Sequence, residues 1–164
     1  MKTIATIQGC AIFAHVHKTG NIHCSMLADG DIDCDGSGGN PDHDPYFQPD
    51  TSLHHDGKPL NAYKVPFIVL PPAALSGVGP QVLGCSCKVY DRETDLWVDG
   101  VVGDIGPRFK VGEISVEMAR RLGMPNNPNT GGTSDFNRLL YVWYPGVPAV
   151  VDGITYKLQN YRGA

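Results

Sequence analysis

The sequence has no cluster of lysine and arginine residues and no long apolar segment. Its 13 basic and 17 acidic side chains give a net charge of -4, so binding to nucleic acid is not expected. The longest mainly apolar stretch, residues 65–78, contains three prolines and is shorter than the roughly 20 residues of a membrane-spanning helix. The N-terminal segment is too polar for the apolar region of a signal peptide. We therefore predict no membrane partner and see no export signal.

The motifs of several common enzyme classes are also absent. The chain has no G-x-S-x-G nucleophile elbow, no H-E-x-x-H zinc motif and no phosphate-binding P-loop. Cys85 and Cys87 are not followed by a second Cys/His pair at ligand spacing, which argues against a structural zinc site. We predict a protein that uses no metal and no cofactor.

The five cysteines are odd in number, so at least one of them has no disulfide partner within the chain. The spacing of Cys24 and Cys34 permits a loop-closing disulfide. Buried thiols are the alternative, and we favour them because no export signal is visible.

Glycine and proline are abundant, with 20 and 13 residues, which favours a turn-rich β-protein over a helical bundle. A length of 164 residues fits one catalytic domain spanning residues 1–164. The one convincing helix covers residues 115–122, with Ser115 as N-cap and Gly123 as its end. Residues 28–59 show almost no periodicity and are predicted to form a long functional loop. Strands are predicted within residues 3–16, 64–70, 87–91, 96–104, 141–144 and 147–158.

The segment DGDIDCDG places aspartates at every second position from Asp29 to Asp35. Asp31, Asp33 and Asp35 match the first half of an EF-hand loop, but its twelfth position is Asp42 instead of glutamate. On a strand the same alternation would place the aspartates along one face. Neighbouring carboxylates repel one another and need a positive partner, which either calcium or a polymeric amine would supply.

The segment VVGDIGPRFKVGEIS contains two acids, Asp104 and Glu113, each preceded by glycine and separated by the turn-forming Gly106-Pro107. Two carboxyl groups that face one cleft can carry out general acid and base catalysis, which glycosidic-bond hydrolysis requires. Solvated turn residues are the alternative interpretation of this pair.

Together with DPYFQPDT, LNAYKVPFIVLP and NPNTGG, these segments resemble the chitosanases of glycoside hydrolase family 75, from about Asp29 to Gly132. The resemblance implies endo-hydrolysis of β-1,4-linked glucosamine polymer with inversion, and assigns the essential acids to Asp104 and Glu113. It also implies an extracellular enzyme. The stretch from Val101 through the helix is similar to the strand-turn-helix of double-psi barrels. We therefore expect a mainly β, six- to seven-stranded, double-psi-like barrel with long loops.

The acidic segment suits a substrate that carries ammonium groups. We assign substrate binding to Asp31, Asp33, Asp35, Asn61 and Lys64, although a structural salt bridge would equally explain Lys64. Glu113 is expected to be the acid and Asp104 the base, because glutamate has the higher reference pKa by about 0.4 unit. Five aromatic residues could stack on sugars or pack in the core: Tyr46, Trp97, Tyr141, Trp143 and Tyr144.

Chitosan or its oligosaccharides are the predicted partner of a monomeric enzyme. Two other functions stay open. A lytic transglycosylase or another glycanase acting on peptidoglycan would form anhydro-sugar ends and need one acid. A calcium-stabilised carbohydrate-binding module would show no turnover.

Overall fold

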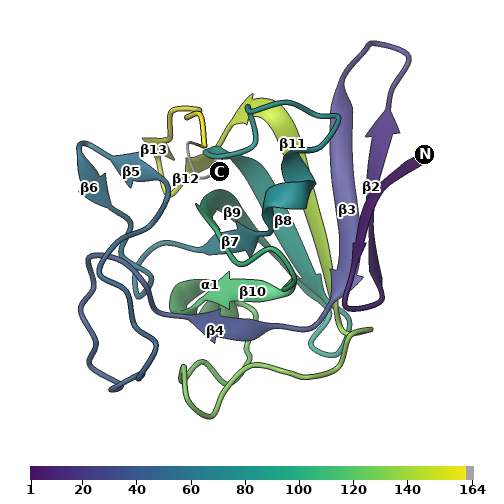
Figure 1. The fold of residues 1–164 in the computed structure, drawn as a ribbon. Helices are drawn as coiled ribbons and strands as arrows, with labels where there is room; N and C mark the ends of the chain where they lie inside the picture. The colour runs from purple at the N-terminus through teal and green to yellow at the C-terminus, as the bar shows by residue number, and fades with distance from the viewer. Residues whose placement is uncertain (162–164) are drawn as a thin grey trace.

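The computed structural model describes residues 1–161 and is mainly β, with 43% strand and 6% helix. One sheet of nine strands, in the order β1-β2-β3-β11-β8-β9-β7-β10-β4, curls into a half-barrel (Figure 1). Its strands are β1 (Lys2–Ile7), β2 (Cys10–Val16), β3 (Ile22–Ala28), β4 (Asp31–Asp33), β7 (Phe67–Leu70), β8 (Cys85–Asp91), β9 (Leu96–Ile105), β10 (Glu113–Ser115) and β11 (Leu139–Pro148).

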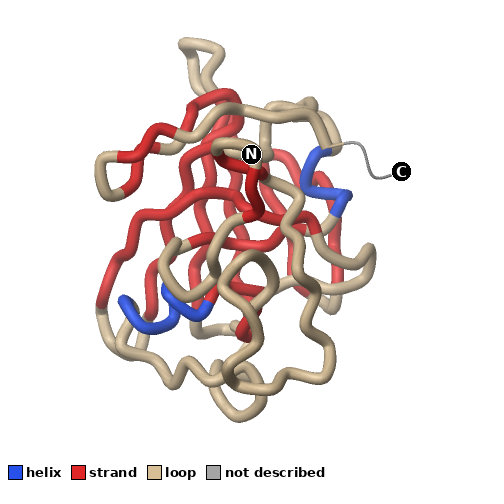
Figure 2. The backbone as a smooth tube through the Cα atoms, turned by 90° about the vertical axis from the view of Figure 1, so that its left-hand side faces the viewer, coloured by secondary structure: helices blue, strands red, loops and turns tan. Residues whose placement is uncertain are grey.

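Four short strands and two helical segments complete the described part of the fold. The strands form two hairpins, β5 (His54–His55) with β6 (Lys58–Pro59) and β12 (Val150–Val151) with β13 (Ile154–Thr155). The helical segments are α1 (Val116–Arg121) and the 3-10 helix η1 (Pro72–Leu75). Figure 2 shows how the strands curve around one another, with long loops gathered at one end of the sheet.

The structure confirms the mainly β class, but the sheet has more strands than the six or seven predicted. The additional strands include β3 and β10, which the sequence pattern did not indicate, and β4, which the alternating aspartates allowed as a strand. Strand β10 contains three residues, too few for an alternating pattern to be recognised. The predicted hairpin is present, since β8 and β9 pair antiparallel with Asp91 opposite Leu96.

The predicted helix is present as α1, which begins after Ser115. The Ser115 hydroxyl accepts a hydrogen bond from the backbone N–H of Met118 at 3.1 Å and donates one to the carbonyl of Val65 at 2.8 Å. The first bond satisfies a helix donor that would otherwise be unpaired. The second ties the start of the helix to the segment that leads into β7, so the cap also positions the strand beside the predicted catalytic acids.

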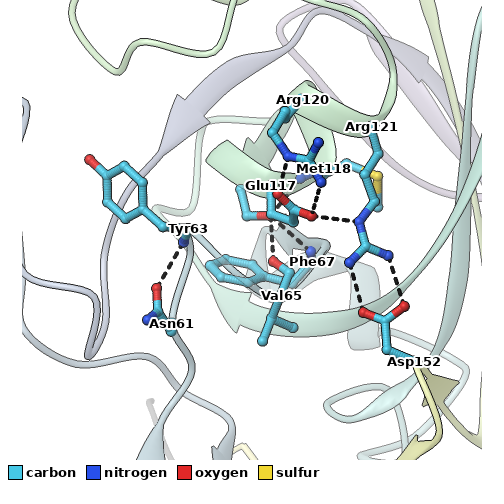
Figure 3. A network of polar contacts seen from close by, with 10 residues as sticks. Asn61, Tyr63, Val65, Phe67, Glu117, Met118, Arg120, Arg121 and Asp152 are labelled. Atoms are coloured by element: carbon cyan, nitrogen blue, oxygen red, sulfur yellow. Dashed lines mark hydrogen bonds and ion pairs between the residues drawn. The ribbon is translucent and has the colours of Figure 1, made fainter.

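Helix α1 is joined to the β12–β13 hairpin by ion pairs around the buried Glu117 (Figure 3). The Glu117 carboxylate accepts hydrogen bonds from Arg120 at 2.6 and 2.7 Å and from Arg121 at 2.7 Å. Arg121 in turn pairs with Asp152 at 2.7 Å. These hydrogen bonds pair a carboxylate that would be costly to bury alone.

A second buried ion pair joins β8 to the start of β11. The Asp91 side chain is fully buried, and Arg138 donates two hydrogen bonds to its two oxygens, both at 2.9 Å. Burial raises the pKa of Asp91, but the hydrogen bonds from Arg138 and from the Glu93 N–H outweigh it and hold this pKa below its ordinary value.

All five cysteines lie among the described residues as buried, free thiols, so Cys24 and Cys34 do not form a disulfide. The prediction of buried thiols is confirmed. Burial raises the pKa of the Cys24 thiol to about 12, which makes it a poor nucleophile. Within residues 1–161, no helix combines the length and the apolar character needed to cross a membrane.

Candidate active site

The sheet brings the two predicted catalytic acids to the same face. Strand β7 lies between β9 and β10, and Val69 of β7 pairs with Asp104 on one side and with Glu113 on the other. Residues opposite one another in a sheet point to the same face, so both carboxyl groups project together. Two strand spacings separate their Cα atoms by roughly 10 Å.

The glycine before each acid has a structural reason. Ile68 pairs with Val102 and Val69 pairs with Asp104, so Gly103 is an extra residue in β9 that sets the direction of the Asp104 side chain. A Cβ atom at Gly103 would lie 2.7 Å from a methyl carbon of Leu60. At Gly112, before Glu113, the φ angle of +80° and a space closed by Asp29 both require glycine.

The aspartate segment lies beside the catalytic strands. Strand β4 pairs in parallel with β10, with Asp31 opposite Glu113 and Asp33 opposite Ser115. The structure therefore confirms the strand interpretation for Asp31–Asp33, whereas the chain after it is loop. Carboxylate oxygens of Asp33, Asp35 and Asp104 lie within 4.8 Å of one another.

Two clefts meet at these acids and form one groove. The first has a volume of about 460 Å³, and its lining includes Asp33, Asp35, Asp50, Asp104 and Glu113. The second, of about 520 Å³, is lined in part by Asp31, Asp44, Tyr46, Lys110 and Asn129. Both clefts share Asp33, Asp35, Pro107 and Glu113. An extended molecule can therefore cross Glu113 with one part in each cleft.

The Asp104 carboxylate is fixed by donors on one of its oxygens. Its Oδ1 accepts hydrogen bonds from the Ser52 N–H at 2.9 Å, the Ser52 hydroxyl at 2.7 Å and the Ile105 N–H at 3.0 Å. Burial raises the pKa of Asp104, and these hydrogen bonds oppose that rise by favouring the ionised form. A carboxylate held in this way is suited to accept a proton.

We expect Ser52→Ala to lower kcat/KM for a polymer substrate about tenfold, because a hydrogen bond to a charged group contributes about 1.5–3 kcal/mol and two backbone donors to Asp104 persist. Loss of the hydroxyl raises the pKa of Asp104, so the acid limb of the pH profile should move to higher pH. Ser25→Ala on β3 is the matched control, because its hydroxyl contacts His15 away from the groove. An unchanged acid limb would show that Ser52 does not tune Asp104.

The Glu113 carboxylate has a cationic neighbour instead. Lys110 Nζ lies 3.4 Å from Glu113 Oε1 and 3.0 Å from Asp31 Oδ2. Burial raises the pKa of Glu113, and Lys110 opposes this rise. Burial lowers the pKa of Lys110, but the two carboxylates raise it overall, so Lys110 is a cation at neutral pH.

The remaining groove acids are also perturbed by their surroundings. Burial and the neighbouring charge of Asp35 raise the pKa of Asp33 well above its usual range. Burial also raises the pKa of Asp35, although the Gln48 N–H donates a hydrogen bond to its carboxylate at 2.8 Å. Behind the groove, burial and the charge of Asp31 raise the pKa of Asp29 to about 6. This crowding of carboxylates favours a cationic ligand.

The structure brings together five of the seven predicted site residues, namely Asp31, Asp33, Asp35, Asp104 and Glu113. Asn61 and Lys64 do not line either cleft. The Asn61 amide oxygen accepts a hydrogen bond from the Tyr63 N–H at 2.9 Å, as Figure 3 shows, and Lys64 is exposed to solvent. Their role in substrate binding stays a prediction without support from this placement.

Two residues of the site were missed by sequence reasoning. Ser52 lies 52 positions from Asp104 in the chain, and no local pattern marks it. Lys110 is three positions before Glu113, so its spacing did offer a signal. Lys110, not Lys64, is the lysine that lies beside the groove carboxylates.

The aromatic residues take different places. Tyr141 and Trp143 are fully buried in the core. Trp97 is 51% exposed but packs near Tyr90 and Lys88, and Tyr144 lies near His23. Tyr46 is 84% exposed and lines the second cleft, which makes it the candidate for stacking on a sugar ring.

The geometry does not match an EF-hand loop at Asp31–Asp42. Asp31 and Asp33 are in a strand, and the Asp42 carboxylate accepts a hydrogen bond from the Tyr63 hydroxyl at 2.7 Å. The bidentate ligand that an EF-hand takes from its twelfth position is therefore missing from this arrangement. The cluster of Asp33, Asp35 and Asp104 combines groups from separate segments instead.

Comparison with known proteins identifies a family match. The model of the family described as fungal chitosanase of glycosyl hydrolase group 75 matches residues 30–162. This segment covers most of the chain and includes the acids of the groove. No curated protein matches the sequence.

Proposed function

We propose that this chain, which belongs to the fungal chitosanase family of glycosyl hydrolase group 75, cleaves internal β-1,4 bonds of chitosan with inversion. Membership in this family supports the assignment of the chain as a glycoside hydrolase. The observation that carries the finer proposal is the register of Val69 with both Asp104 and Glu113 at an acidic groove. Because chitosan is an extracellular polymer, we also propose that the enzyme acts outside the cell as a monomer.

In our proposal the two acids have different catalytic roles. Glu113 protonates the glycosidic oxygen while Asp104 removes a proton from a water molecule that attacks the anomeric carbon. Three hydrogen bonds to Asp104 Oδ1 favour the carboxylate form that a base needs. Inverting enzymes separate their carboxyl groups by about 6.5–9.5 Å, and a Cα separation of roughly 10 Å is compatible with that distance.

Substrate recognition relies on charge in this proposal. Ammonium groups of glucosamine units bind the carboxylates of Asp31, Asp33 and Asp35 by charge-assisted hydrogen bonds. Burial raises the pKa of both Asp33 and Asp35, and the charge of Asp35 adds to the rise at Asp33; the positive charge of a bound ammonium offsets these effects. Tyr46 adds a ring on which a sugar can stack in the second cleft.

The decisive experiment combines viscometry and a reducing-end assay on soluble chitosan with NMR of the newly formed anomeric centre. We expect a rapid fall in viscosity, which indicates internal cleavage, and α-anomeric products that appear before mutarotation. Products that first appear as the β-anomer would refute inversion. Anhydro-sugar ends on peptidoglycan would support the transglycosylase alternative.

Treatment with EDTA distinguishes the proposed catalysis from the calcium-stabilised binding module. We expect EDTA to leave the rate and the melting temperature unchanged, because no metal takes part in the proposed steps. Absence of turnover together with a melting temperature lowered by EDTA would support the calcium-stabilised binding module.

A further inference from the structure

We propose that Lys110 is a positioning residue that favours the ionised form of Glu113 in the free enzyme and moves away when a substrate ammonium group binds at Asp31. Binding of the substrate thereby generates the protonated acid that the reaction needs. This inference rests on the proposed function, in which Glu113 is the general acid.

Lys110 occupies a position that suits a glucosamine ammonium group. The parallel pairing of β4 with β10 places Asp31 opposite Glu113, and Lys110 Nζ contacts both carboxylates, at 3.0 and 3.4 Å. An amino group of chitosan offers the same charge and the same hydrogen-bond donors as the lysine. The polymer and Lys110 therefore compete for the Asp31 carboxylate.

Differences in exposure indicate which contact is exchanged. The Asp31 side chain is 48% exposed and that of Lys110 is 37% exposed, whereas the Glu113 side chain is only 16% exposed. A substrate ammonium can therefore reach Asp31 from solvent. Like-charge repulsion then displaces the flexible lysine, while the bound ammonium lies on the solvent side of Asp31 and farther from Glu113.

The surroundings of Glu113 make the displacement effective. Among the described residues, Lys110 is the cation that lowers the pKa of Glu113, and burial raises it. The other titratable groups that share its environment come from three neighbouring segments and are all acids: Asp29, Asp31, Asp33, Asp104 and Tyr141. Once Lys110 has moved, burial and nearby carboxylates act together to favour protonated Glu113.

The proton balance of this step is complete without a further reactant. Glu113 takes one proton from bulk water as the polymer binds and gives it to the glycosidic oxygen as the bond from the anomeric carbon breaks. The attacking water supplies a hydroxyl group to that carbon and its proton to Asp104. Release of that proton to solvent restores the resting enzyme.

The test compares pH profiles of Lys110→Met and the wild-type enzyme on one chitosan oligosaccharide, so that titration of the substrate amines is the same in both. The kcat/KM profile reports the free enzyme and the kcat profile reports the complex. We expect the basic limb of kcat/KM to move up by about one pH unit in the variant, with the basic limb of kcat unchanged.

Three outcomes would overturn the inference. Equal shifts in both profiles would show that Lys110 stays beside Glu113 in the complex. No shift in either profile would show that Lys110 does not control Glu113. A shift in the kcat profile alone would show that Lys110 acts on Glu113 in the complex and not in the free enzyme. Failure of the wild-type enzyme to cleave chitosan would instead refute the proposed function itself.

Two further variants separate charge from structure. Lys110→Arg keeps the cation and should retain the wild-type profiles. Lys110→Gln is a second neutral substitution, used if Lys110→Met folds poorly, and should show the shift expected for Lys110→Met. Lys18→Met, at an exposed lysine in the turn between β2 and β3, is the matched control and should change neither profile. A shift with Lys110→Arg equal to that with methionine would contradict a role for charge.

Discussion

Asp104→Asn and Glu113→Gln are each expected to lower kcat on chitosan about 100- to 10,000-fold, because general acid or base catalysis contributes that much. Both substitutions preserve side-chain size, and in Asp104→Asn the Ser52 and Ile105 donors can still bond to the oxygen of the introduced amide. The folded structure should therefore persist, which circular dichroism and a melting curve will check. A variant that keeps near-native turnover would remove that acid from the mechanism.

A substrate that needs no protonation assigns the two roles. Fluoride leaves without a proton, so Glu113→Gln should cleave a chito-oligosaccharide fluoride much better than it cleaves chitosan. Asp104→Asn should be slow on both substrates, because the attacking water still needs a base. The reverse pattern would exchange the assigned roles. Asp99→Asn is the control, since this exposed acid lies on β9 but outside the residues that line the groove.

Arg138→Met is expected to lower the free energy of unfolding by about 3–5 kcal/mol at pH 7, because it leaves the buried Asp91 carboxylate without its partner. Chemical denaturation followed by tryptophan fluorescence measures this change. Arg92→Met is the matched control: Arg92 is exposed and donates to the Asn137 carbonyl, so its loss should cost less than about 1 kcal/mol.

The effect of this ion pair should depend on pH in one direction. The pKa of Asp91 is lowered in the folded protein, so the pair contributes its full stability above the unfolded value of about 3.9. The contribution is lost as the pH falls through the folded pKa. The difference between wild type and Arg138→Met should therefore shrink on acidification. A difference that is constant from pH 7 to pH 3 would show that packing, not charge, is responsible.

The sequence predicted those elements whose signals are local. Alternating apolar residues identified the β8–β9 hairpin, and Ser115 followed by apolar positions identified α1. Strands β4 and β10 depend on pairing with each other across about 80 positions of the chain. The alternating aspartates allowed a strand at β4, but the three residues of β10 show no period, and the curl of the sheet depends on long-range pairing that local pattern does not reveal.

The same distinction applies to the site. Glycine-flanked Asp104 and Glu113 were identifiable because turn residues and acids lie together in one short segment. Ser52 could not be found, because a serine in a polar loop has no feature that distinguishes it before the loop folds onto β9. Asn61 and Lys64 were selected from their motif alone, and motif membership does not determine whether a side chain faces the groove.

The bulge at Gly103 makes activity sensitive to the number of residues as well as to their identity. Deleting this one glycine would remove the bend that sets the direction of the Asp104 side chain, with both amino acids of the catalytic pair still present. The length of the loop between β4 and β5 is constrained as well, because its Ser52 hydroxyl donates a hydrogen bond to Asp104 and its Asp35 and Tyr46 line the groove.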